Sequence, residues 1–184
     1  ANQMKYLFTG GGTAGHITPA LAVAEVLLRR DTNAKILFVG REGGAENEKI
    51  RALGYEVREI PIAGLERRFT PKNAAALLTL FRGLSHAGRI LREECPDVVL
   101  GTGGYVSYPV LHTAARYGIP TFLHESNAVP GLAARRLARR CDGVLLGVPG
   151  SESAFPRGTR TLAVGNPVRR GFSERSKKEE KRRQ

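Results

Sequence analysis

The stretch Tyr6-Leu-Phe-Thr-Gly-Gly-Gly-Thr-Ala-Gly-His-Ile-Thr-Pro-Ala-Leu-Ala-Val-Ala24 joins a short apolar run to a helical pattern through a cluster of glycines. The run at residues 6–8 predicts a buried strand, and Gly10-Gly11-Gly12 allow the backbone to turn with positive φ and to approach a ligand closely. We expect the helix to begin at Thr18-Pro19, because Thr is a good N-cap and Pro fits the first helical turn. Such a turn presents free N–H groups and the positive end of a helix dipole, so it favours phosphate or another anion.

Strand-like and helical patterns alternate along the rest of the chain. The apolar runs lie at Lys5–Phe8, Ile36–Val39, Val57–Ile60, Val98–Leu100, Thr121–Leu123 and Val144–Leu146. The helical patterns lie at about 19–30, 45–53, 72–93, 107–117 and 130–140. Because the strands are apolar along their length and alternate with helices, they predict a doubly wound, Rossmann-like parallel sheet of the α/β class, with helices on both faces.

Length and composition are those of a single soluble globular domain. The chain has 184 residues, of which 41% are apolar and 25% charged. We expect one Rossmann-like domain at residues 1–168, followed at 169–184 by a basic tail or the start of a connection to a further domain. The two cysteines, Cys95 and Cys141, have neither metal-binding nor disulfide-framework spacing, and we expect buried thiols in a reducing compartment. The sequence offers no membrane span or signal peptide, which favours the cytoplasm.

The formal net charge of +12 favours an anionic partner. Residues 169–184 hold eight basic and three acidic side chains, a net +5, so residues 1–168 carry +7. A basic surface of this kind suits nucleic acid, anionic lipid or phosphorylated substrates, while the last residues are equally compatible with a solvated tail. We expect a membrane surface and phosphorylated substrates, and no nucleic acid, as partners.

The segment between the third and fourth strands combines apolar and basic residues. One stripe of its helix should pack on the sheet, comprising Leu77, Leu80, Phe81, Leu84 and Leu91. A second group, outside that stripe or at its border, would form a membrane patch of Phe69, Leu78, Arg67, Arg68, Lys72, Arg82 and Arg89. Exposed apolar residues ringed by Arg and Lys suit an anionic membrane, although the same pattern fits an ordinary amphipathic helix.

Two further loops follow strands and carry polar groups. Gly101-Thr-Gly-Gly-Tyr105 repeats the glycine-rich turn before a helix, with Ser107 as the expected cap. His124-Glu-Ser-Asn127 brings an imidazole, a carboxylate and an amide, and the amide could bridge sugar or phosphate or cap the next helix. Glycine loops at the carboxyl ends of neighbouring strands define the crevice in which open α/β sheets bind ligands. Beside it His16 offers a titratable base, and Glu125 could orient a sugar hydroxyl or that base.

Gly10, Gly12 and Gly15 also satisfy the G-x-G-x-x-G pattern of dinucleotide-binding proteins. In that class an acidic residue after the second strand holds the ribose, and Glu42 is the candidate. An NAD(P)-dependent oxidoreductase is therefore an alternative class. The three aspartates form no D-x-D pair, and no His or Cys cluster has ligand spacing, so we expect neither a metal nor a cofactor.

Four segments together resemble the N-terminal half of the bacterial peptidoglycan glycosyltransferases of the MurG family, which have the two-domain GT-B fold. The segments are GGGTAGHITPALAVA from Gly10, GTGGYVSYPVLHTAA from Gly101, HESNAVPGLAARRLA from His124 and GNPVR from Gly165. Ala14 and Ser126 depart from the family pattern, which has glycine and glutamine at those positions.

The resemblance implies an undecaprenyldiphospho-muramoylpentapeptide β-N-acetylglucosaminyltransferase. Such an enzyme moves GlcNAc from UDP-GlcNAc to the 4-hydroxyl of MurNAc in lipid I, with inversion and without a metal, and forms lipid II. This chain would be the half that binds lipid I, peripheral on the cytoplasmic face of the cell membrane, and the family's donor domain is absent from it. Alone it should bind acceptor and membrane but not catalyse. A stand-alone membrane-associated half that needs a separate donor-binding chain is the alternative.

By the same resemblance, individual residues take roles. His16 would be the base that removes the proton of the acceptor hydroxyl, with Glu125 as the competing candidate. The acceptor diphosphate would lie on the two glycine loops, at Gly11, Gly12, Gly103, Gly104 and Tyr105. The donor UDP-GlcNAc would be contacted by Thr13, Ala14, Gly15, Asn127 and Arg169.

Overall fold

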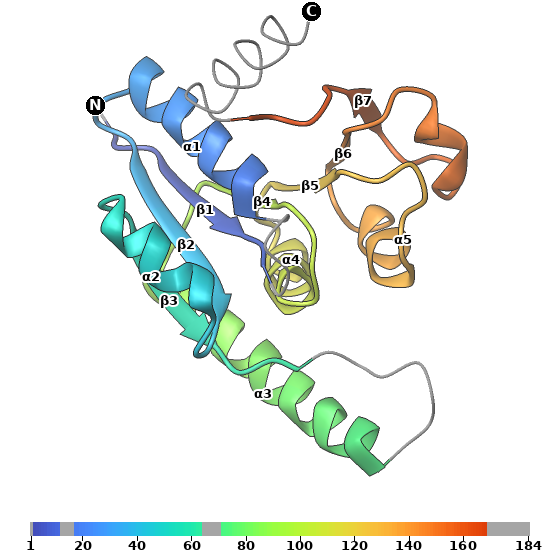
Figure 1. Cartoon of the computed structure of the whole chain (residues 1–184), viewed down its shortest axis with the longest axis horizontal. Coiled ribbons are helices and arrows are strands. Elements are labelled where there is room, and N and C mark those ends of the chain that lie inside the picture. The colour runs from blue at the N-terminus through green and yellow to red at the C-terminus, as the bar shows by residue number, and fades with distance from the viewer. Residues whose placement is uncertain (1, 12–16, 64–70, 169–184) are drawn as a thin grey trace, which may run out of the picture.

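Seven parallel strands form one sheet in the computed structural model, in the order β3-β2-β1-β4-β5-β6-β7 (Figure 1). The structure describes residues 2–11, 17–63 and 71–168, without the side chains of residues 71 and 72. The strands are β1 (Lys5–Thr9), β2 (Lys35–Arg41), β3 (Glu56–Ile60), β4 (Val98–Gly101), β5 (Thr121–Glu125), β6 (Gly143–Leu146) and β7 (Thr161–Ala163). The helices are α1 (Ile17–Arg30), α2 (Ala45–Ala52), α3 (Pro71–Glu94), α4 (Ser107–Arg116), α5 (Leu132–Ala138) and the short 3-10 helix η1 (Ser151–Ala154).

Helices cover both faces of the sheet. On one face α1 and α2 enclose a cluster around Phe8 and Phe38, whose rings stack with 5.3 Å between their centroids. On the other face α3, α4 and α5 pack through a larger cluster that includes Leu91, Leu111 and Leu137. Strands buried on both faces need apolar side chains at successive positions, which explains the uninterrupted apolar runs of the sequence. The predicted doubly wound α/β fold is confirmed.

Several local features differ from the sequence predictions. α1 begins at Ile17, so Thr18 lies inside the helix and is not its N-cap. Val106 occupies the cap position of α4, because the Ser107 hydroxyl bonds backbone carbonyls instead of a helix N–H. The sequence analysis did not predict η1 and β7, although Leu162-Ala163-Val164 is a short apolar run that overlaps β7, a strand of only three residues of which two are exposed.

The two cysteines lie in different environments. Cys95 is exposed, which contradicts the expectation that both thiols are buried. It follows the last turn of α3 with a φ of 46°, at a chain reversal on the surface. Cys141 is half-buried, and this burial raises the pKa of its thiol to about 11.

α3 extends well beyond the strands on which it packs (Figure 1). Its 24 residues span about 36 Å, whereas the five residues of β3 span about 17 Å. Leu91 is buried and Leu80 and Leu84 are partly buried, but Leu77 and Phe81 are 48% and 62% exposed. The prediction that Leu77 and Phe81 pack on the sheet is therefore wrong, because they lie on the half of the helix that projects past it.

A charge cluster at the amino edge of the sheet ties three strands to the end of α3. The Glu94 carboxylate lies 3.0 Å from Lys5 Nζ, 2.9 Å from Arg58 Nη1 and 3.8 Å from Lys35 Nζ. The hydrogen bond from Lys5, helped by the charges of all three cations, lowers the pKa of Glu94 below its ordinary value. The carboxylate is mostly buried, so these bonds are weakly screened and contribute to stability.

We expect Glu94→Gln to lower the free energy of unfolding by about 1–3 kcal/mol near pH 7, because it removes charge-assisted hydrogen bonds from Lys5 and Arg58 and an ion pair with Lys35. Urea unfolding followed by circular dichroism measures this difference. Since the pKa of Glu94 is lowered in the folded state, its contribution to the free energy of unfolding is complete above about pH 4.5, the ordinary pKa. This contribution is lost as the pH falls through the lowered pKa. The gap between the two proteins should therefore close in acid, and a gap that stays constant between pH 7 and pH 3 would contradict this account.

Candidate functional site

The carboxyl ends of β1, β4 and β5 meet at one edge of the sheet. The strand register aligns Thr9 with Gly101 and Gly101 with Leu123, so the segments that follow these strands start side by side. The order of the chain reverses between β1 and β4, since β1 pairs with β2 on its other side. Open α/β sheets bind ligands at such a switch point, outside the carboxyl ends of the strands. The described parts of the three predicted site segments therefore share the edge where a ligand is expected.

The loop between β4 and α4 presents a run of backbone N–H groups. Gly103 and Gly104 have φ values of 102° and 80°, a region that glycine enters without strain. Within the described residues, nothing accepts a hydrogen bond from the N–H groups of Gly103, Gly104 or Tyr105. Successive N–H groups of this kind, just before a helix, form a concave site for an anion.

Hydrogen bonds fix this loop to the end of β1. The Thr102 N–H donates to the Thr9 carbonyl at 2.9 Å. The Ser107 hydroxyl lies 3.2 Å from the same carbonyl and 2.8 Å from that of Gly103, so its single proton can bond either one. Ser107 thus holds the loop in place instead of capping α4.

The first glycine loop is described only as far as Gly11. This residue has a φ of 127°, and a Cβ added to it would lie 2.5 Å from Glu46 Oε1, so a carboxylate of α2 flanks it. The remaining predicted site residues of this region, and one beyond β7, lie outside the described residues: Gly12, Thr13, Ala14, Gly15, His16 and Arg169.

Glu125, the last residue of β5, is a buried carboxylate that holds the loop after it. It is only 8% exposed, and its Oε1 accepts the N–H of Asn127 at 3.1 Å. Its backbone carbonyl accepts the N–H of Gly147 from the segment after β6. The side chain of Asn127 is exposed at the same edge of the sheet. These contacts give Glu125 a positioning role for Asn127.

His124 is a structural residue to which the sequence analysis assigned no role. It is 2% exposed, and its Nε2 lies 3.0 Å from the Gly165 carbonyl. Because a carbonyl oxygen only accepts hydrogen bonds, Nε2 carries the proton. Asn166 also approaches the Ser126 carbonyl, at 3.5 Å. The segments that begin at His124 and Gly165, 41 residues apart, are therefore neighbours, which spacing in the sequence could not reveal.

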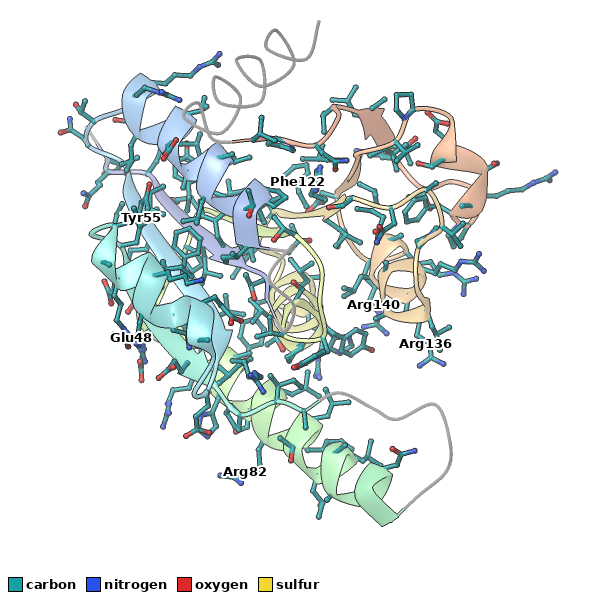
Figure 2. The ribbon with its side chains drawn as sticks, viewed as in Figure 1. Glu48, Tyr55, Arg82, Phe122, Arg136 and Arg140 are labelled. Carbon is teal, nitrogen blue, oxygen red and sulfur yellow. The ribbon has the colours of Figure 1, made fainter. Side chains whose placement is uncertain are left out.

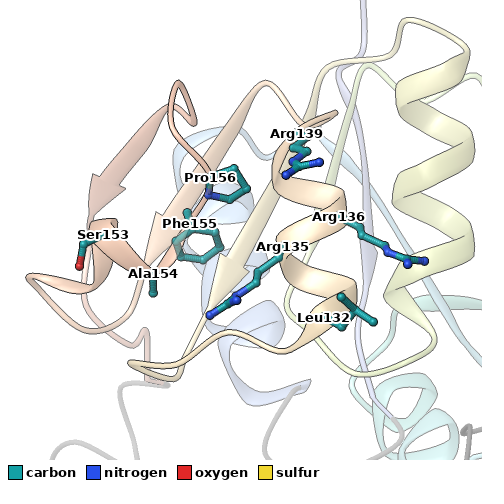
Figure 3. Close-up of a pocket in the computed structure, with 8 residues that line it drawn as sticks. All are labelled: Leu132, Arg135, Arg136, Arg139, Ser153, Ala154, Phe155 and Pro156. Carbon is teal, nitrogen blue, oxygen red and sulfur yellow. The ribbon is translucent and has the colours of Figure 1, made fainter.

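A basic depression lies between α5 and η1 (Figure 3). It encloses about 530 Å³, and its lining includes Arg135, Arg136, Arg139, Phe155 and Pro156. In Figure 3, Arg135 is directed toward the segment of Phe155, whereas Arg136 is directed toward α4. None of the predicted site residues lines this depression, so it is a separate feature of the surface.

The exposed side of α3 carries the described part of the predicted membrane patch. Leu78 is 68% exposed, and Leu77 and Phe81 add apolar surface that the prediction had assigned to the core. Arg82 is exposed and points away from the body of the molecule (Figure 2). Arg89 lies further along the helix, where its Nε is 4.0 Å from Glu93 Oε1. The other members lie outside what the structure describes, as whole residues or as side chains: Arg67, Arg68, Phe69 and Lys72.

None of the helices in the described ranges combines the length and the apolar character that crossing a bilayer requires.

A doubly wound parallel sheet with a glycine-rich loop at its switch point is typical of α/β domains that bind a ligand at that edge. Residues 6–146 match the family model of the glycosyltransferase family 28 N-terminal domain, and the chain belongs to this family. Membership of this family overturns the alternative of an NAD(P)-dependent oxidoreductase.

The chain is also similar to individual curated relatives and to solved structures. The chain is 44% identical over 176 residues to the UDP-N-acetylglucosamine–N-acetylmuramyl-(pentapeptide) pyrophosphoryl-undecaprenol N-acetylglucosamine transferase of Thermoanaerobacter sp. (strain X514), an alignment that covers 96% of this chain and 48% of the relative. The crystal structure of Acinetobacter baumannii MurG superposes with a TM-score of 0.75 at 26% identity, over 94% of this chain and 48% of that one. The UDP-GlcNAc 2-epimerase of Neisseria meningitidis, at 16% identity and a TM-score of 0.65 over 95% of this chain and 50% of that one, shares the fold. This chain thus spans about half the length of the curated relatives it matches.

Gly104→Ala tests the anion site, with Gly118→Ala as a matched control. Both glycines have φ values near +75°, 80° and 72°, so both variants carry a similar backbone strain of about 1–2 kcal/mol. Only Gly104→Ala should also weaken binding of inorganic diphosphate, by about tenfold, because it disturbs the run of free N–H groups. Isothermal titration calorimetry measures the affinities, and equal affinities for the two variants would remove this loop from the anion site.

Proposed function

We propose that this chain is the acceptor-binding half of an inverting glycosyltransferase that moves GlcNAc from UDP-GlcNAc to the 4-hydroxyl of MurNAc in lipid I, forming lipid II. The observation that carries the proposal is the loop at Gly103–Tyr105, whose N–H groups have no partner within the described residues and which lies at the switch point of a family 28 domain. The name of the 44% identical relative supports the choice of donor and acceptor. On this proposal residues 1–168 are the acceptor domain, and 169–184 begin the connection to the donor domain.

The acceptor diphosphate rests on the two glycine loops. Gly103, Gly104 and Tyr105 supply N–H groups, and Gly11 and Gly12 approach from β1. The donor is held mainly by the second domain, with Thr13, Ala14, Gly15, Asn127 and Arg169 as its contacts in this half. Holding both substrates in one closed cleft is what makes the reaction fast, so the chain alone binds acceptor but transfers no sugar.

The reaction is a single displacement. The 4-hydroxyl oxygen of the acceptor forms a bond to the anomeric carbon of GlcNAc while the bond from that carbon to the UDP oxygen breaks, and UDP leaves with the electron pair. A general base takes the hydroxyl proton, which contributes about 10²–10⁴-fold to the rate. His16 is the proposed base. Glu125 fits a supporting role better, because its carboxylate is buried and already accepts the N–H of Asn127.

In the two-domain protein, His16→Ala should lower kcat by about 10²–10⁴-fold with little change in either KM, because the base acts only in the transition state. Glu125→Gln should mainly raise the KM for UDP-GlcNAc, because a neutral amide holds the loop at Asn127 less firmly. Steady-state kinetics with both substrates varied separates the two effects. If Glu125→Gln instead lowers kcat by about 10²–10⁴-fold and His16→Ala changes only KM, then Glu125 is the general base and His16 is a binding residue.

The polyprenyl chain of the acceptor stays in the bilayer, so the acceptor half must approach the membrane surface. The proposed contact is the projecting half of α3 and the segment before it, with Phe69 and Leu78 entering the interface. The basic residues of the proposed contact are Arg67, Arg68, Lys72, Arg82 and Arg89. Each basic residue near an anionic surface contributes about 1 kcal/mol, which gives reversible, salt-dependent binding at the cytoplasmic face.

Vesicles of phosphatidylglycerol test this contact. A chain that ends at Gly171, which removes most of the charge of the tail, should co-sediment with the vesicles at low salt and be released as salt rises. Leu78→Glu with Arg82→Glu should abolish binding. Lys49→Glu with Leu53→Glu changes the net charge equally on the exposed surface of α2 and should leave most of the binding intact. If both double variants bind alike, α3 is not the membrane contact.

A further inference from the structure

An apolar groove opens beside Tyr105, the last residue of the proposed diphosphate loop. It encloses about 330 Å³, which lies within the range of small-molecule pockets. Three stretches of chain contribute apolar walls: Ile62 after β3, Leu80 on α3, and Leu132 with Ala133 on α5. A ligand that uses both the loop and the groove would therefore combine an anionic group with an apolar chain.

Arg136 supplies the one charge among the described residues that line the groove. It has no acidic partner in the described part of the chain, and it lies on the side of α5 that faces α4 (Figure 3). A cation with no ion-pair partner at the rim of an apolar groove complements an anion held at that rim.

The apolar wall continues out of the groove along α3. Leu80 lines the groove, and Leu77 and Phe81, three positions before and one after it, are exposed on the projecting half of the helix. Residues three and four apart share one face of a helix, so Leu77, Leu80 and Phe81 form a continuous apolar track. This track joins the groove to the surface that carries Leu78, the proposed membrane contact.

We propose that the groove receives the first isoprene units of a polyprenyl diphosphate. The chain then packs against Leu80 and Leu132 and leaves along α3 toward the bilayer, while Arg136 lies beside the diphosphate on the glycine loop. The inference rests on the proposed function, which supplies a lipid-linked diphosphate as acceptor. A nucleobase fits less well, because the groove is mostly apolar and offers few partners for the polar edge of a base.

Farnesyl diphosphate and inorganic diphosphate are the probes, and the 184-residue chain is titrated with each by calorimetry. We expect farnesyl diphosphate to bind at least tenfold more tightly, because the groove buries its chain. Ala133→Trp fills the groove from an exposed position and should remove this preference while leaving the affinity for inorganic diphosphate unchanged. Ala52→Trp, exposed on α2, is the matched control and should keep the preference. Arg136→Ala should weaken both ligands, and Arg135→Ala, on the side of α5 nearer Phe155, should weaken neither.

A second variant guards against disturbed folding. Leu132→Ser is also at an exposed position and should reduce the preference for the farnesyl chain without changing the thermal midpoint. Equal affinities for the two probes, or a full preference retained in Ala133→Trp, overturn the groove assignment and leave the diphosphate loop standing. If neither probe binds, the proposed acceptor loop fails and the groove assignment fails with it.

Discussion

The parallel pairing of β1 with β4 is the constraint on which the rest of the site depends. It aligns Thr9 with Gly101, so the two glycine loops leave the sheet at the same level, and the Thr102 N–H bonded to the Thr9 carbonyl continues the ladder one step further. Because the chain order reverses at this point, β1 leads to α1 on one face of the sheet and β4 leads to α4 on the other. The loop between β4 and α4 therefore starts at the edge of the sheet where a ligand is expected.

The neighbouring loops are held by interactions that need no ligand. The Ser107 hydroxyl can bond a carbonyl on either side of the switch point, Glu125 accepts the Asn127 N–H, and His124 bonds the Gly165 carbonyl. A site built on such prior contacts loses little conformational freedom on binding, which favours affinity and precise placement of the reacting groups. The buried Glu125 is part of this framework, and for that reason His16 is the better proposed base.

Because of its length, α3 connects the candidate site to the proposed membrane contact. A helix that ended with the sheet would bury its apolar stripe, as the sequence analysis expected for Leu77 and Phe81. Because α3 projects past β3, the same stripe is buried at Leu91 and exposed at Leu77 and Phe81. The same amphipathic pattern is therefore packed into the core at one end of the helix and exposed on the surface at the other.

Most of the fold could be predicted from local sequence patterns, because strands buried on both faces contain apolar runs that are easily recognised, as at Ile36–Val39. The predictions were wrong where the environment of a residue depends on contacts between distant segments. Helical periodicity is the same on and beyond the sheet, so it could not place Phe81 outside the core. Helix-capping preference could not show that the Ser107 hydroxyl lies within bonding distance of the end of β1. β7 was missed because a strand of three residues cannot be told from a loop by its pattern alone. The candidate loops could be predicted, because glycine clusters between a strand and a helix are typical of anion-binding turns. The groove beside Tyr105 could not be predicted, because residues from distant segments of the chain line it.

Equilibrium binding of the 184-residue chain to its two proposed substrates tests the central claim most directly. A water-soluble, short-chain analogue of lipid I and UDP-GlcNAc are titrated separately at the same salt concentration. The account predicts that the lipid I analogue binds at least tenfold more tightly, because its diphosphate site lies in this half and most of the donor site does not. UDP-GlcNAc binding as tightly as the analogue, or an analogue that does not bind, would contradict the claim that this chain is the acceptor half.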